Sequence, residues 1–109
     1  MESDPLGAVF AALAHQGRRR MLDVVKATPG CNVNHVASHF EMSRIAVMKH
    51  LRVLADAHLV VTERAGRTKL HYLNAVPIRE IHDRWIAPYR EPVAAGLLAL
   101  RDHVEGATT

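Results

Sequence analysis

The sequence predicts a mainly α-helical domain that carries one small β-hairpin, an α+β fold. Three observations lead to this prediction. Apolar residues recur every three or four positions through most of the chain, which is the spacing of an amphipathic helix. Between residues 59 and 73 two short β-rich runs flank a glycine instead. The 109 residues, 49% of them hydrophobic, suffice for a single domain, 1–109, with a modest core.

Two helices are expected before residue 30. The first covers residues 4–13 and opens with Asp-Pro, because proline suits the first turn of a helix. His-Gln-Gly at residues 15–17 interrupts the pattern, and a second helix should run from about Arg18 to Ala27. Arg18 and Arg20 are expected either to meet phosphate or to pair with acids such as Asp23 or Asp56, and the pairing is favoured. The apolar face of the first helix consists of Leu6, Val9, Phe10 and Leu13.

A short helix, a tight break and a longer helix are expected between residues 33 and 54. In the short helix Val36, Ala37 and Phe40 share one face. Ser43 follows the break and can cap the longer helix, because its hydroxyl can accept from the free amides of the first turn. The inward stripe of the longer helix consists of Val47, Leu51 and Leu54.

The outward face of the longer helix is basic. Three of its side chains are cationic and none is acidic, although cations near a helix N-terminus oppose the helix dipole. Arg44 is therefore not there to stabilise the helix, and a rod of this kind suits the major groove of DNA. An ordinary helical hairpin with a solvated basic face is the plainer alternative. The outward residues are Arg44, Ile45, Met48, Lys49 and Arg52.

Two strands follow, from 59 to 64 and from 67 to 73, and Ala65-Gly66 is expected to form the reversal between them. Arg64, Arg67 and Lys69 gather at the tip of this hairpin. A plain hairpin does not need such a concentration of cations, whereas a hairpin that lies along a phosphate backbone does.

The last segment, 77–105, reads as helix interrupted near Pro88 and Pro92, since proline lacks an amide donor. Its apolar stripe is long for so small a chain. One alternative is that the stripe covers the core of its own chain. The favoured alternative is that it pairs with the first helix, 4–13, to form a homodimer interface. Residues 14–75 would then form the DNA-binding core. The stripe consists of Ile78, Ile81, Trp85, Tyr89, Val93, Leu97, Leu100 and Val104.

Charge and composition narrow the class of protein. Residues 43–69 carry six cations and two anions, a net +4, whereas residues 77–109 carry a net −1. This asymmetry favours a surface for a polyanion and a separate surface for something else. No run approaches the roughly 18 apolar residues of a membrane span, and the first ten residues carry acids where a signal peptide carries cations. The protein is expected to be cytoplasmic, and Cys31, its one cysteine, can form no intrachain disulfide.

The elements and short motifs together form a pattern that covers residues 5–104. It comprises 13–14 with 18–22 (Leu-Ala, Arg-Arg-Arg-Met-Leu), Ser43-Arg44 with Val47, 50–54 (His-Leu-Arg-Val-Leu), Leu59-Val60, the 64–67 turn with its glycine, and Tyr72. This pattern resembles the ArsR-type winged helix–turn–helix repressors, and the segment of Trp85 and Tyr89 is similar to the subgroup without metal sites on the last helices. The resemblance implies a homodimer that represses transcription by covering a promoter and dissociates from it in response to a signal. The residues do not identify that signal.

The sequence departs from the metal-sensing relatives. Those proteins place two cysteines, one residue apart, at the start of the third helix, where this chain has Asn32 and Asn34 beside Cys31. One thiolate and two amides suit a thiophilic metal poorly. A second family metal site, on the final helix, is matched only in part, by Glu80, His82 and Asp83. No metal, no other cofactor and no catalytic residue is therefore expected.

The residues expected to bind double-stranded DNA fall into two groups. Arg44, Met48 and Lys49 are candidates for base-edge contact, because arginine or lysine can donate to guanine N7 and O6. For Lys49 a phosphate contact is an equal alternative. Arg52 and Ser43 are expected to meet phosphate, and His50 to be a packed, hydrogen-bonded histidine. The hairpin residues, Arg64, Arg67 and Lys69, should reach the backbone or the minor groove.

Two rival interpretations remain open. A domain of this fold can bind a protein rather than DNA. Alternatively, His35 and His39, four residues apart on one helix, could hold a metal with Cys31 in a small metal-binding protein, although no further ligand is evident.

Overall fold

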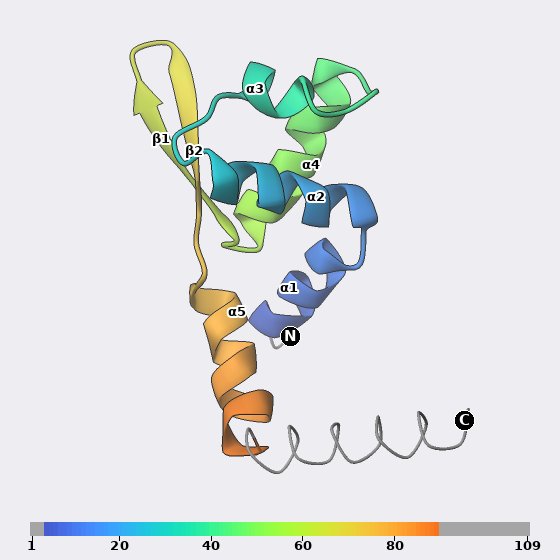
Figure 1. Ribbon diagram of the computed structural model, residues 1–109, viewed down its shortest axis with the longest axis vertical. Coiled ribbons are helices and arrows are strands. Elements are labelled where there is room, and N and C mark those ends of the chain that lie inside the picture. The colour runs from blue at the N-terminus through green and yellow to red at the C-terminus, as the bar shows by residue number, and fades with distance from the viewer. Residues whose placement is uncertain (1–3, 90–109) are drawn as a thin grey trace, which may run out of the picture. The chain divides into compact units, whose positions relative to one another are not determined.

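The computed structural model describes residues 4–89, which form a sequence of helices with one hairpin (Figure 1). The chain divides into two compact units, Met1–Pro77 and Ile78–Thr109. The boundary coincides with the expected start of the last helical segment. Four residues of the expected dimer interface lie outside the described residues: Val93, Leu97, Leu100 and Val104.

The first unit opens with helices α1 (Pro5–Leu13) and α2 (Gln16–Ala27). The proline at the start of α1 stands where the sequence places it, and Ala14 ends the helix. Helix α2 begins two residues before the predicted start. The reason is an N-terminal cap that was not predicted from the sequence: Nδ1 of His15 accepts a hydrogen bond from the Gly17 amide at 3.0 Å.

Helices α3 (Val33–Ala37) and α4 (Arg44–Asp56) follow. Helix α3 is shorter than predicted, and Phe40 lies beyond its end. The amides of His39 and Phe40 each bond to the carbonyl three residues back, which tightens the chain and stops the helix. The predicted cap of α4 is confirmed, because the Ser43 hydroxyl accepts from the Ala46 amide at 3.1 Å.

Strands β1 (Val60–Ala65) and β2 (Thr68–Leu73) pair antiparallel from Val60–Leu73 to Ala65–Thr68. This register makes Gly66-Arg67 the two-residue turn, so the prediction of Ala65-Gly66 was wrong by one residue. Gly66 supplies the positive φ, 64°, at the first turn position alone, as in type II′ turns. The shift places Arg67 at the outermost point of the hairpin.

Helix α4 is the centre of the first unit, since it contacts α1, α2, α3 and β1 (Figure 1). Its predicted inward stripe is confirmed: Val47, Leu51 and Leu54 are all buried. Burial of such apolar side chains is the main source of stability in a domain of this size. The largest fully buried side chains are Met21, Val25, Val36, Val47, Leu54 and Leu59.

The base of the hairpin is tied to the segment between α2 and α3. The Gly30 amide donates to the His71 carbonyl at 2.8 Å, and the His71 amide donates to the Cys31 carbonyl at 2.9 Å. The buried His71 ring adds a third bond, from Nδ1 to the same Cys31 carbonyl at 3.0 Å. Gly30 has a φ of 81° and lies against Tyr72, where a Cβ would be 3.2 Å from the phenol oxygen. These bonds fix the hairpin beside α3.

The chain continues as α5 (Val76–Ile81), a π-helical turn η1 (His82–Ile86) and a 3₁₀ turn η2 (Ala87–Tyr89). Helical structure after residue 77 was predicted, and the 3₁₀ turn contains Pro88, one of the two prolines expected to interrupt it. Arg79 and Asp83 form an exposed ion pair at 3.6 Å. None of the helices within residues 4–89 is long and apolar enough to span a membrane.

Candidate nucleic-acid interface

The exposed face of α4 carries the residues that the sequence assigns to DNA. Ser43 caps the helix, and its hydroxyl proton is still able to be donated to a phosphate while the oxygen accepts from Ala46. The next turn presents Arg44 and Ile45 to solvent, and the turn after it presents Met48 and Lys49. Arg52 follows on the same face. The basic face is therefore open to a partner rather than covered by the described part of its own chain.

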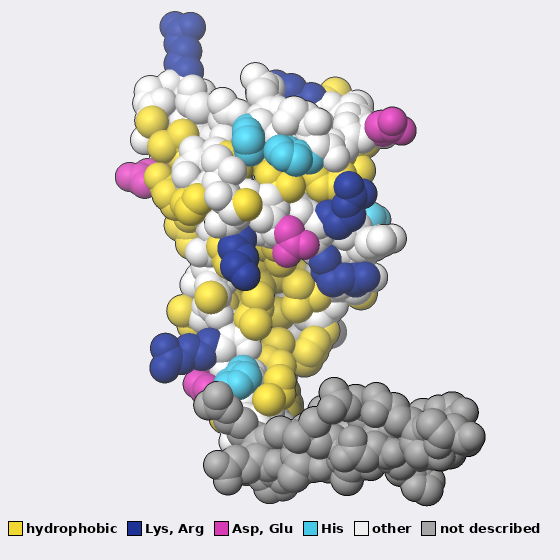
Figure 2. All heavy atoms as spheres, in the orientation of Figure 1, with side chains coloured by type: hydrophobic (Ala, Val, Ile, Leu, Met, Phe, Trp, Pro, Cys, Tyr) yellow, Lys and Arg dark blue, Asp and Glu magenta, His cyan; other side chains and the backbone are white. Residues whose placement is uncertain are grey.

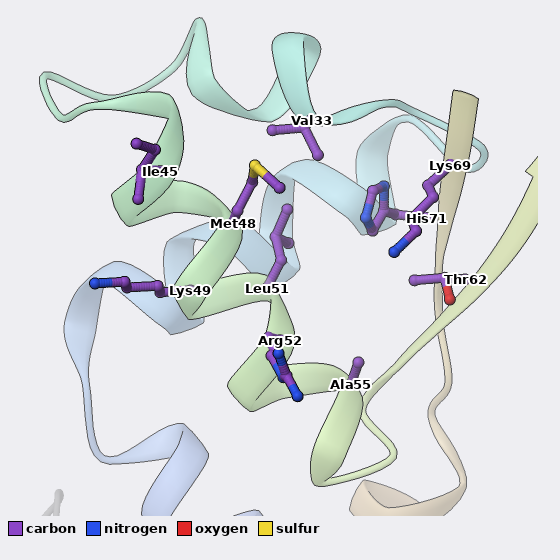
Figure 3. Close-up of a pocket in the computed structure, with 10 residues that line it drawn as sticks. All are labelled: Val33, Ile45, Met48, Lys49, Leu51, Arg52, Ala55, Thr62, Lys69 and His71. Atoms are coloured by element: carbon purple, nitrogen blue, oxygen red, sulfur yellow. The ribbon is translucent and has the colours of Figure 1, made fainter. Parts of the chain in front are cut away.

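A groove of about 440 Å³ lies between this face of α4 and the hairpin (Figure 3). Helix α4 contributes Met48, Lys49 and Arg52 to one wall, and β2 contributes Lys69 to the other. Apolar side chains line the groove together with these three cations. The remaining lining residues are Val33, Ile45, Leu51, Ala55, Thr62 and His71.

A second groove of about 280 Å³ lies beside the first, and the two share Val33, Met48 and Lys69. It runs from the start of α3 and α4 to the hairpin tip, where Arg64 and Arg67 line it. In Figure 2 a cationic side chain extends beyond the tip of the hairpin. The two grooves bring together all six cations predicted for DNA binding, and no acid lines either one: Arg44, Lys49, Arg52, Arg64, Arg67 and Lys69.

Arg44 is held by a contact that the sequence analysis missed. Its Nε donates to Oδ1 of Asn34, on α3, at 3.0 Å. Among residues 4–89 no other bond engages the guanidinium, so both Nη groups remain available to a partner. The fork of an arginine is suited to two parallel hydrogen bonds, as guanine N7 and O6 require. The only sequence signal was an asparagine ten residues before an arginine, which predicts no contact.

Within residues 4–89 neither Arg18 nor Arg20 pairs with an acid, so the favoured expectation was wrong. Arg18 instead donates to the carbonyls of Ala12 at 2.8 Å and Ala11 at 3.0 Å, and Arg19 donates to the Leu13 carbonyl at 2.6 Å. Carbonyls at a helix end lack intrahelical partners, and cations nearby also favour the dipole. Arg20 lies over the Phe40 ring at 4.9 Å. Each of these three arginines therefore has a partner within its own chain.

His50 is packed as predicted, on the side of α4 that meets α1 and α2. An Nη group of Arg18 donates to its Nδ1 at 3.4 Å, and the ring centroid of His15 lies 4.7 Å away. Burial lowers the pKa of His50, and the neighbouring charges of His15 and Arg18 lower it further.

The residues considered for metal binding have other roles. Asn32 caps α3, with Oδ1 accepting from the His35 amide at 2.8 Å. His39 donates through Nδ1 to the His35 carbonyl at 3.0 Å, and the two rings meet edge to face. Burial raises the pKa of the Cys31 thiol. Within residues 4–89 no three histidine, cysteine, aspartate or glutamate side chains cluster to hold a metal.

The expected dimer residues differ in their accessibility. Phe10 on α1 is about half exposed, and so are Trp85 and Tyr89 in the last segment. Leu6 and Leu13 are partly exposed. Val9 is placed differently from the prediction: only 3% of its surface is accessible, because it packs in the core of its own chain. Val9 therefore cannot contribute to an interface with a second copy.

Comparisons with known proteins agree with this geometry. The chain is 31% identical over 85 residues to the uncharacterised HTH-type transcriptional regulator YuzN of Bacillus subtilis, a match that covers 72% of this chain and 92% of that protein. It is 28% identical over 72 residues to the transcriptional repressor SdpR of the same organism, covering 66% of this chain and 79% of SdpR. No protein-family model matches the chain.

Solved structures agree in fold. A crystal structure of an ArsR family transcriptional regulator aligns with a TM-score of 0.69 and 27% identity over 86% of this chain and 97% of that one. An ArsR-like regulator from Rhodococcus sp. RHA1 aligns with a TM-score of 0.66 and 26% identity over 84% of this chain and 88% of that one. With α3 and α4 as its helix–turn–helix and the β1–β2 hairpin as its wing, the chain belongs to the ArsR family of winged helix–turn–helix transcriptional regulators.

Proposed function

We propose that this regulator is a homodimeric repressor that binds an inverted-repeat operator with one α4 in each of two successive major grooves. The observation that carries the proposal is the gathering of six cations on α4 and the wing, around two grooves that no acid lines. Neutralised phosphates supply most of the affinity of such an interface.

The two halves of the surface have different tasks. Near the start of α4, Arg44 and Lys49 donate to guanine, and each good bidentate contact discriminates by about 1–3 kcal/mol. Arg52, further along the helix, and the Ser43 hydroxyl contact phosphate and fix the register. Arg67 and its neighbours Arg64 and Lys69 on the wing follow the backbone or enter the minor groove.

A second copy is needed for a complete site. A single α4 reads only a few base pairs, whereas two copies related by a two-fold axis place their helices about 34–36 Å apart on one side of the duplex. The exposed aromatic side chains of α1 and of the last segment, with Phe10 and Tyr89 as examples, are the proposed interface. A dimer seated on a promoter excludes the polymerase, which is why we propose repression.

A gel shift with the DNA upstream of the protein's own gene tests the proposal. We expect a complex of two chains per duplex, with affinity falling about 10³- to 10⁵-fold between 50 and 200 mM salt if six to ten phosphates are neutralised. The triple variant R44A/K49A/R52A should no longer form this complex. The control variant K26A/R79A removes two exposed cations that line neither groove and should still bind this DNA. Failure to bind this DNA, or any DNA selected from random duplexes, would favour a protein-binding role instead.

A further inference from the structure

Two large apolar side chains lie in the middle of the basic face. Ile45 is 67% exposed and Met48 is 46% exposed. Neither serves the core, because Val47, Leu51 and Leu54 form the buried stripe of α4. Single exposed hydrophobic residues are ordinary, but these two stand on successive turns of one helix and both line one groove. In Figure 3 Met48 points toward Val33 and the hairpin, whereas Ile45 lies at the other side of α4.

The helix places cations on both sides of this apolar pair. At about 100° per residue, Met48 lies about 40° from Arg44, and Ile45 lies about 40° from Lys49 on the other side. Arg52 points between Ile45 and Met48, two turns of helix from the first of them. The face therefore has a positive margin and an apolar middle near its N-terminal end.

The floor of the major groove offers one apolar group to such a surface, the C5 methyl of thymine. The cations commit the surface to a polyanion, and the apolar pair then meets base edges rather than phosphates. Val33 of α3 lines the same groove beside Met48, which keeps the surroundings of a methyl group apolar. A purely apolar protein partner would leave the flanking Arg44 and Lys49 unpaired.

We infer that Ile45 and Met48 read thymine methyl groups, so that each operator half-site carries thymine opposite the N-terminal half of α4. The inference rests on the proposed function, because it concerns the same DNA surface. It assigns part of the sequence selectivity to apolar contact rather than to hydrogen bonds from Arg44 and Lys49.

Replacement of thymine by uracil in the DNA tests the inference, since it removes the methyl group and leaves the base pair intact. An operator is first selected from random duplexes, and each thymine of one half-site is then changed in turn. For the wild-type protein we expect one or two positions at which uracil weakens binding about fourfold, the equivalent of one buried methyl group. At each such position, I45A or M48A should make the thymine and uracil duplexes bind equally, according to which of the two residues contacts that methyl group.

Two controls make the result specific. Val61 is exposed on the outer face of β1, so V61A should keep the wild-type ratio of thymine to uracil affinity. The conservative variant I45V should give a ratio between those of wild type and I45A. Unchanged thermal melting of I45A and M48A will show that these exposed substitutions leave the fold intact.

The outcomes separate the two proposals. If no sequence is enriched from random duplexes, the proposed function fails. If an operator is enriched but lacks thymine in its half-sites, binds equally well with uracil, or keeps its thymine preference in both I45A and M48A, the thymine inference fails and the proposed function stands.

Discussion

The separate roles proposed for α4 and the wing predict different effects for two arginine substitutions. Arg44 and Arg67 are both exposed cations that line the same groove. Removing either side chain should leave the fold intact, because neither is buried. Arg44→Ala should reduce the preference for operator over random DNA, whereas Arg67→Ala should weaken binding to both alike.

The magnitude for Arg44 follows from its geometry. Nε is engaged by Asn34 at 3.0 Å, and both Nη groups are available for a bidentate contact. Such a contact discriminates between bases by about 1–3 kcal/mol, which is about 5- to 150-fold for each half-site. Arg67 meets phosphate in this account, so its loss should lower the slope of log affinity against log salt by about 0.9 for each phosphate contact removed.

Fluorescence anisotropy with an operator duplex and a scrambled duplex, each titrated at several salt concentrations, measures both quantities. Asn34→Ala adds an internal control. If Asn34 orients Arg44, N34A should reduce operator preference in the wild-type background and have no further effect in R44A. Equal losses from R44A and R67A on both duplexes would refute the division between base reading and backbone binding.

Three further predictions concern the fold. Leu54→Ala empties a fully buried site and should lower the free energy of unfolding by about 2–5 kcal/mol in urea titrations, whereas exposed Ile45→Ala should change it by no more than about 0.5 kcal/mol; similar values for both would contradict the assigned core. The fold lowers the pKa of His50, so the unfolded chain protonates this histidine more readily than the folded chain. The melting temperature should therefore fall as pH drops below the ordinary histidine value of 6.5, and His50→Gln should flatten that dependence. The same pH dependence in the variant would refute this prediction. The buried Cys31 thiol, with its raised pKa, should react with Ellman's reagent only as fast as the chain unfolds, and rapid reaction of the native protein would show the site to be open.

The parts of the fold that the sequence predicted well depend on local periodicity. The stripe of Val47, Leu51 and Leu54 repeats at helical spacing, and Ser43 stands at the one position from which it can cap α4. The cations of the wing were also assigned to the surface where the structure places them. These features need only the neighbours of each residue along the chain.

The errors came from contacts made by backbone groups and by residues distant in sequence. Helix α3 stops early because the amides of His39 and Phe40 bond three residues back, and the spacing of apolar residues does not predict these bonds. The turn moved by one residue because the pairing of Ala65 with Thr68 decides it. Arg18 donates to a carbonyl at the end of α1 rather than to an acid, and Arg44 donates to the Asn34 side chain. The partners of Arg18 and Arg44 are six and ten residues away and are identified only by the fold.

Methylation interference on the operator tests the central claim most directly, because methyl groups on guanine N7 project into the major groove. We expect two clusters of interfering guanines, centred about 10–10.5 base pairs apart on one side of the duplex, one for each α4 of a symmetric pair. A single cluster, or interference confined to adenine N3 in the minor groove, would contradict it.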